Sequence, residues 1–161
     1  MDLLIVRHAK AEDRAATGGD AKRALTDEGV RKMRQAASGL RGQVPELGRV
    51  FTSPYVRAEQ TARILADRYG CPVALLDALR PGSDPQAIAD ALSEADGAAA
   101  VVGHEPDLGR LACWFLTGRG CGALPLKKAG ACLLRFRGDP GPGRADLRWL
   151  LTPKQLRQLA D

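Results

Sequence analysis

The sequence predicts an α/β protein with helices on the faces of a sheet, and three observations favour this fold class. Short apolar segments alternate with amphipathic ones along the first two thirds of the chain. Hydrophobic residues make up 45% of the chain and aromatic residues only 4%, which suits a core packed with Leu, Val and Ala. A length of 161 residues fits one domain with a real core, so residues 1–161 are expected to form a single domain.

The first elements follow from apolar runs and from capping residues. The run LLIV at 3–6 predicts a buried strand. The Thr26-Asp27 pair can cap a helix that continues to about residue 40. After a short strand over 49–52, Pro54 is expected at the first position of another helix, where its missing N–H costs nothing. That helix is expected to end near Gly70.

The rest of the chain continues this alternation and then changes. Two strands and two helices are expected in turn, over 73–76, 85–92, 98–102 and 107–116. The segments 131–136 and 146–151 look like strands joined by the turn-rich sequence GDPGPGRA, which predicts an antiparallel hairpin. A short helix from Pro153 closes the chain, and the sequence contains no internal repeat.

Hydropathy argues against a membrane as partner, and the placement of the aromatic residues argues against nucleic acid. No apolar run approaches the ~20 residues that span a bilayer, and the amino terminus lacks the basic region of a signal peptide. We therefore expect a cytoplasmic protein that does not bind a membrane. The net charge of +5 favours anionic partners, although an ordinary solvated surface is the simpler explanation. Aromatic residues are not interleaved with the basic ones, so nucleic acid is not an expected partner.

The four cysteines and two histidines indicate neither a metal site nor a disulfide framework. No pair of cysteines has CxxC spacing, and all four are expected to be reduced thiols: Cys71, Cys113, Cys121 and Cys132. Neither histidine lies in an HExxH or similar ligand set. The sequence therefore predicts neither a metal nor another cofactor.

Two histidines and two arginines are expected to meet at one edge of the sheet. Arg7 and His8 come directly after the first strand, and His104 follows the buried strand AAAVVG. Arg57 lies one turn into the helix after the strand over 49–52. Ligands bind at the carboxyl ends of strands in open α/β sheets. Each residue alone could be structural, and their joint placement is what favours a functional site.

These residue types suit the transfer of a phosphoryl group. A neutral imidazole is a good nucleophile toward phosphorus and forms a labile phosphoramidate. Guanidinium groups match the charged equatorial oxygens of the transferring group. Nearby cations keep His8 neutral, since a like charge disfavours its protonation. Helix N-termini after Ser53-Pro54 and after Glu105-Pro106 would add amide donors.

Four motifs occur in the order found in the histidine phosphatase superfamily, and they are LLIVRHAKAE, LTDEG, FTSPYVRAEQTA and VVGHEP. The chain most resembles the SixA-type phosphohistidine phosphatase branch of that superfamily, over nearly its whole length. The resemblance implies a three-layer, phosphoglycerate mutase-like fold with a mostly parallel six-stranded sheet that includes one antiparallel strand. It also implies that His8 accepts the phosphoryl group, that Arg7, Arg57 and His104 complete the pocket, and that Arg23 lies near the site.

The resemblance offers two candidates for a general acid. Asp77 is the nearest match to the glutamate of mutase-like members, and the match is poor. Glu105 resembles the histidine–acid pair of the phytase-like branch, and its other interpretation is a carboxylate that complements a helix dipole. The long insertion that covers the site of larger members is absent. An open site without a strong acid suits phosphohistidine, whose imidazole leaving group can bring its own proton.

The resemblance therefore implies a phosphatase. The expected substrate is a phosphorylated protein, such as a histidine phosphotransfer domain. The first alternative is a phosphatase for small phosphorylated metabolites or for phosphoserine and phosphothreonine. The second is a phosphate-binding regulatory module that has lost turnover, against which the complete set of His8, Arg7, Arg57 and His104 argues. The sequence does not indicate an oligomeric state.

Overall fold

All six strands lie in one sheet. The computed structural model describes residues 1–160, so residue 161 of the expected domain lies outside the described residues. The strands are β1 (Asp2–Arg7), β2 (Arg49–Thr52), β3 (Val73–Leu75), β4 (Ala99–Gly103), β5 (Ala131–Phe136) and β6 (Ala145–Leu151). Their order is β3-β2-β4-β1-β5-β6. Only β5 runs opposite to the others, because β1 and β6 both pair with it antiparallel. The expected sheet is confirmed.

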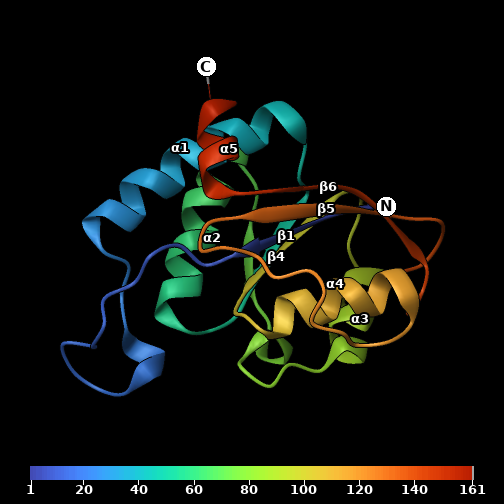
Figure 1. Ribbon diagram of the computed structural model, residues 1–161, viewed down its shortest axis with the longest axis horizontal. Coiled ribbons are helices and arrows are strands. Elements are labelled where there is room, and N and C mark those ends of the chain that lie inside the picture. Colours follow the sequence, from blue (N-terminus) through green and yellow to red (C-terminus); the bar gives the residue numbers. More distant parts are fainter. Residues whose placement is uncertain (161) are drawn as a thin grey trace.

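Helices cover both faces of this sheet, which makes three layers (Figure 1). Helices α1 (Asp27–Gln43), α2 (Val56–Tyr69) and α5 (Pro153–Gln158) pack on one face. Helices α3 (Pro85–Ser93) and α4 (Asp107–Thr117) pack on the other. Two short 3₁₀ helices, η1 (Asp20–Lys22) and η2 (Asp77–Leu79), lie in the loops. Within residues 1–160, no helix has both the length and the apolar character needed to cross a membrane.

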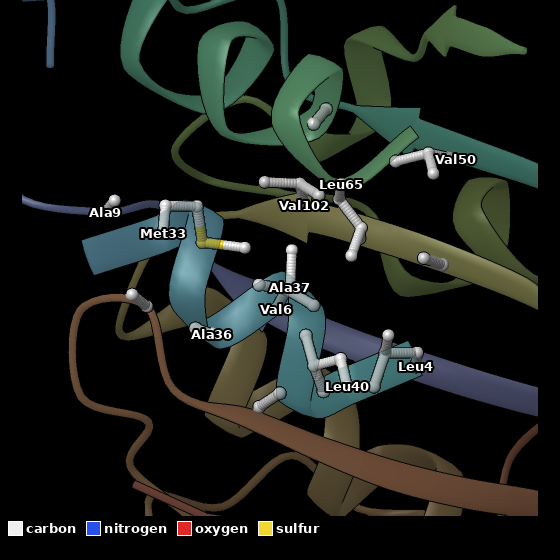
Figure 2. Close-up of a cluster of buried hydrophobic side chains, with 14 of the residues drawn as sticks. Leu4, Val6, Ala9, Met33, Ala36, Ala37, Leu40, Val50, Leu65 and Val102 are labelled. Atoms are coloured by element: carbon white, nitrogen blue, oxygen red, sulfur yellow. The ribbon is translucent and has the colours of Figure 1, made fainter. Parts of the chain in front are cut away.

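The core is divided by the central strand β1, whose side chains alternate between the two faces. Leu4 and Val6 point toward α1 and α2, while Leu3 and Ile5 point toward α3 and α4. Figure 2 shows the first of these clusters, in which Met33 and Leu40 of α1 lie over β1. A strand that is buried on both faces must be apolar at every position, which explains the uninterrupted LLIV run.

Local hydrogen bonds and backbone geometry explain where the helices begin and end, and one predicted helix start is wrong. Thr26 caps α1 as predicted, since its Oγ1 accepts a hydrogen bond from the Gly29 N–H at 2.9 Å. The predicted position of Pro54 at the start of α2 is wrong. The helix begins two residues later, because Ser53 and Tyr55 form a turn in which the Tyr55 N–H donates to Ser53 Oγ. Gly70 ends α2 in the left-handed region, with φ of 68°.

The expectation of four reduced cysteines is wrong for two of them. Cys113 in α4 and Cys121 form a disulfide, while Cys71 and Cys132 are free thiols. The chain reverses direction after α4 at Gly118, whose φ is 80°. This reversal brings the two Cα atoms to 5.6 Å, a separation that the sequence spacing alone does not reveal.

Candidate active site

The structure brings the two histidines and two arginines together at the carboxyl ends of β1, β2 and β4. Arg7 is the last residue of β1 and pairs in register with Gly103 of β4, so His8 and His104 leave the sheet side by side. Their ring centroids are 5.3 Å apart. Arg57, the second residue of α2, reaches His8 from the end of β2. His8, Arg57 and His104 are each at most 5% exposed.

His8 is held as a neutral ring with its lone pair on Nε2. Its Nδ1 lies 2.8 Å from the carbonyl oxygen of Ala9, and because a carbonyl only accepts, Nδ1 carries the proton. Arg57 Nε donates to His8 Nε2 at 3.3 Å. Burial lowers the pKa of His8 to about 3, and the nearby charges of His104, Arg57 and Arg7 act in the same direction. The ring is therefore neutral at neutral pH, with its proton on Nδ1 and with Nε2 facing Arg57.

His104 is fixed by Ser53 and Tyr55, which lie in the turn between β2 and α2. His104 Nε2 and Ser53 Oγ form a hydrogen bond of 2.8 Å. The Tyr55 ring packs edge-on against the imidazole, with centroids 5.1 Å apart. Burial lowers the pKa of His104 to about 4, and Arg57 contributes to the same shift. Its second ring nitrogen, Nδ1, is buried at the site.

Arg7 and Arg57 are positioned mainly through backbone carbonyls. The Arg7 Nη1 donates to the Leu126 carbonyl at 2.9 Å. The Arg57 Nη1 donates to the Asp20 carbonyl at 2.8 Å, and its guanidinium lies 5.1 Å from the centre of the Tyr55 ring. Arg57 Nε remains free to donate to His8 Nε2, and Arg7 Nε is buried without a hydrogen-bond partner.

Two polar atoms of the site are buried without a hydrogen-bond partner. Within residues 1–160, only three buried side-chain nitrogen or oxygen atoms lack one, and they are Arg7 Nε, His104 Nδ1 and Tyr69 Oη. An unpaired buried donor is costly, so such atoms at a site indicate a ligand. An oxyanion supplies the acceptor that Arg7 Nε needs, and it also suits His104 in the tautomer that carries its proton on Nδ1. The part of the chain that the structure describes gathers no three His, Cys, Asp or Glu side chains that could hold a metal ion.

Asp20 is a residue of the site that sequence reasoning missed. Its carboxylate joins Arg57 Nη2 at 3.1 Å and Arg23 Nε at 2.8 Å. Burial alone would raise the pKa of Asp20, but the hydrogen bonds to Arg57 and Arg23 hold it below its usual range. Arg23 therefore reaches the site through Asp20, and its Nη1 donates to the Glu12 carbonyl at 3.0 Å. In the sequence, the i,i+3 spacing of Asp20 and Arg23 indicates that the two side chains can pair, and this was the available sign of the role of Asp20.

The two candidate acids lie in different surroundings. Glu105 accepts a hydrogen bond from the Leu126 N–H at 3.3 Å, next to the carbonyl that holds Arg7. Burial raises the pKa of Glu105, although that hydrogen bond and Arg7 oppose the shift. Asp77 is 82% exposed and forms an ion pair with Arg80 at 3.0 Å. Asp77 thus points into solvent, while Glu105 lies at the edge of the site.

Two further residues fix the backbone around His8. Thr61 Oγ1 accepts from the Ala9 N–H at 3.0 Å and donates to the Arg57 carbonyl at 2.7 Å, which ties the end of β1 to α2. The Ala129 N–H lies within hydrogen-bonding distance of the carbonyl oxygens of both Arg7 and His8, at 3.1 and 3.2 Å. Thr61 belongs to the QTA segment of the third motif, whereas no local pattern pointed to Ala129.

Comparisons with known proteins identify the family and agree with the observed fold. Residues 3–81 match the model of the histidine phosphatase superfamily (branch 1). An uncharacterized protein of Picosynechococcus sp. is 35% identical over 140 residues, which are 84% of this chain and 85% of that protein. Phosphohistidine phosphatase SixA of Escherichia coli is 34% identical over 117 residues, 69% of this chain and 71% of its own. A solved structure of the protein histidine phosphatase SixA complexed with tungstate has a TM-score of 0.83 and 28% identity, and the match covers 97% of this chain and 99% of the other. The chain belongs to the histidine phosphatase superfamily.

Proposed function

We propose that this chain removes a phosphoryl group from a phosphorylated histidine of a protein, through a covalent intermediate on His8. Family membership supports a phosphatase activity. The observation that carries the finer proposal is the state of His8, a buried neutral ring whose Nδ1–H is bound to a carbonyl and whose Nε2 faces Arg57. That is the form of imidazole that attacks phosphorus.

Both half-reactions follow from these positions. Nε2 of His8 attacks the phosphorus atom, a P–N bond forms, and the bond to the leaving group breaks with its electron pair on that group. The arginines and His104 hold the three equatorial oxygens, and the buried Arg7 Nε gains an acceptor. Water then attacks the phosphorus, a P–O bond forms, and the P–N bond breaks with its electron pair returned to Nε2. The proton of the attacking water passes to the solvent, and inorganic phosphate leaves.

A protein phosphohistidine is the proposed substrate because its cleavage needs no strong general acid, and because relatives of this chain are named for that activity. Its imidazole leaving group can carry its own proton, so no strong general acid is required. The Glu105 carboxylate is engaged by the Leu126 N–H, which suits a structural role. The Escherichia coli relative is named a phosphohistidine phosphatase, and a solved structure of the protein histidine phosphatase SixA contains tungstate, a tetrahedral oxyanion like phosphate. A partner with a histidine phosphotransfer domain fits this chemistry.

One observation favours a second candidate, a phosphatase for small phosphorylated metabolites or for phosphoserine and phosphothreonine. Burial raises the pKa of Glu105, and a carboxyl group that holds its proton closer to neutral pH is suited to protonate an alkoxide leaving group. Under this alternative Glu105 is the general acid.

A substrate panel separates the two candidates. Values of kcat/KM are compared for a phosphohistidine protein, a phosphoserine peptide, a sugar phosphate and p-nitrophenyl phosphate. The proposal expects the first and last of these to be cleaved far better than the alkyl phosphates. A turnover mixture quenched in alkali should carry acid-labile label on His8. Label on another residue, or undiminished turnover by His8→Ala, would overturn the assignment of the nucleophile.

A further inference from the structure

A groove of about 460 Å³ lies next to His8 and is formed by four segments that are distant in sequence. These segments are the loop after β1, helix α1, the turn before β5 and helix α5. Figure 1 shows α5 lying beside α1 at one end of the molecule. The groove is lined by six basic side chains and no acidic one, and the six are Lys10, Lys32, Lys127, Lys128, Lys154 and Arg157.

The groove shares its wall with the candidate active site. Ala9 lines the groove, and its carbonyl oxygen is the acceptor for His8 Nδ1. Ala129 also lines the groove, and its N–H contacts the carbonyl oxygens of Arg7 and His8. A molecule seated in the groove therefore lies against the backbone that presents the nucleophile, outside the pocket formed by the arginines.

The groove carries a surplus of positive charge. Glu28 lies beside it and pairs with Lys10 at 2.7 Å and Lys32 at 2.5 Å. The chain has 24 basic and 19 acidic residues. When the six basic residues of the groove and Glu28 are set apart, eighteen basic residues are balanced by eighteen acidic ones. The six basic residues of the groove and Glu28 therefore carry a net charge of +5 beside His8, and Glu12 and Asp13 lie near enough to Lys10 to act on its pKa.

Most of this charge is available to a partner. Lys127, Lys128 and Lys154 are exposed, and within residues 1–160 neither they nor Arg157 forms an ion pair. Like charges held close together repel one another, so an approaching anionic surface gains attraction from several cations at once. The rest of the lining consists of small or apolar residues such as Ala9 and Pro153, which permit close approach.

We propose that this groove docks an acidic surface of the phosphorylated partner protein, adjacent to its phosphohistidine. The inference rests on the proposed function and names the recognition surface for that substrate. Two observations favour a protein over nucleic acid. None of the lining residues is aromatic, whereas single-stranded nucleic acid is bound on stacked aromatic rings. Five of the six cations are lysines, whereas arginine is the residue preferred for bidentate contacts to phosphate.

The test compares two synthetic phosphohistidine peptides that differ only in four positions near the phosphohistidine, glutamate in one and glutamine in the other. The groove variant is Lys127→Ala/Lys128→Ala/Lys154→Ala. The matched control is Arg68→Ala/Arg110→Ala/Arg148→Ala, which removes the same charge from exposed residues that do not line the groove. At low ionic strength, wild-type kcat/KM should be higher for the glutamate peptide. The groove variant should lose that preference, with a ~10-fold fall, while the control changes less than ~2-fold.

Activity on p-nitrophenyl phosphate, which is too small to reach the groove, should be the same in all three proteins. Binding of the unphosphorylated peptides, measured by fluorescence anisotropy, should weaken in the groove variant alone. An equal loss in the control variant, no preference for the glutamate peptide in the wild type, or tighter binding of a single-stranded oligonucleotide of equal charge would overturn the proposal. If the wild type cleaves p-nitrophenyl phosphate but neither phosphohistidine peptide, the proposed substrate is wrong, and the anisotropy measurement still decides whether the groove binds an acidic peptide.

Discussion

Acidification from pH 7 to pH 5 tests whether the two histidines are buried as neutral rings in the site. They are the only histidines in the chain, so no other side chain of this type titrates in that interval. Burial lowers the pKa of His8 to about 3 and that of His104 to about 4, from an ordinary value of 6.5. In the unfolded chain both rings take up a proton as the pH falls through 6.5, while in the folded chain they do not. Acid therefore favours the unfolded state.

The size of the effect follows from these pKa values. Each group contributes a slope of up to ~1.4 kcal/mol per pH unit once the pH is below the pKa of the unfolded state. Between pH 7 and pH 5 this amounts to about 2 kcal/mol per histidine, and about 4 kcal/mol for both. The raised pKa of Glu105 offsets part of this loss, because its folded carboxyl takes up a proton before the unfolded one. Asp2 and Asp20 have lowered pKa values, so their contributions are lost at lower pH.

The measurement is urea unfolding at pH 7, 6 and 5, with the free energy of unfolding extrapolated to water. The wild type should lose most of the calculated ~4 kcal/mol. The double variant His8→Asn/His104→Asn should lose less than ~1 kcal/mol over the same interval, whatever its stability at pH 7, because it has no histidine to protonate. A wild-type stability that is unchanged between pH 7 and pH 5, or an equal loss in the double variant, would refute the neutral burial of the two rings.

Three further predictions concern side chains around the nucleophile. Arg7→Ala and Arg57→Ala should each lower kcat/KM by ~10²-fold or more, as the loss of a preorganised donor does, with little effect on urea unfolding; large destabilisation with normal specific activity would indicate structural arginines. Asp20→Asn should tighten inhibition by inorganic phosphate by ~3- to 10-fold, because the carboxylate competes with an anion for Arg57; weaker inhibition would mean that the charge of Asp20 orients the guanidinium. Glu105→Gln should cost little on phosphohistidine, whereas a selective ~10²-fold loss on phosphoserine would make Glu105 a general acid.

The elements of the fold were predictable because their signals are local. The LLIV run of β1 indicates a strand buried on both faces, and the capping residue Thr26 indicates where α1 begins. The meeting of His8 and His104 was also predictable, since the carboxyl ends of parallel strands share one edge of a sheet. The start of α2 was misplaced because a proline near a strand end fits a turn as well as a first helical position.

The contacts that complete the site were not predictable from spacing. Asp20 meets Arg57 across 37 residues, and the Leu126 carbonyl meets Arg7 across 119 residues. Both partners lie in loops, where neither helical nor strand periodicity fixes the direction of a side chain. The disulfide between Cys113 and Cys121 could not be predicted for a similar reason, because it depends on how the chain turns after α4. Long-range loop contacts of this kind follow from the tertiary fold alone.

Under the proposed function, the way His8 is held explains how this histidine would act as a nucleophile without a carboxylate partner. A carboxylate on Nδ1 would stabilise the protonated ring and raise its pKa, whereas the Ala9 carbonyl fixes the same tautomer without adding a full charge. The neighbouring cations Arg7 and Arg57 then serve both states of the reaction. Together with burial they disfavour a proton on Nε2 before transfer, and in the proposed intermediate the same charges would stabilise the phosphoryl group on that atom. The proposed transfer takes place at Nε2 and leaves the Nδ1 bond to Ala9 in place, so it requires no turning of the ring.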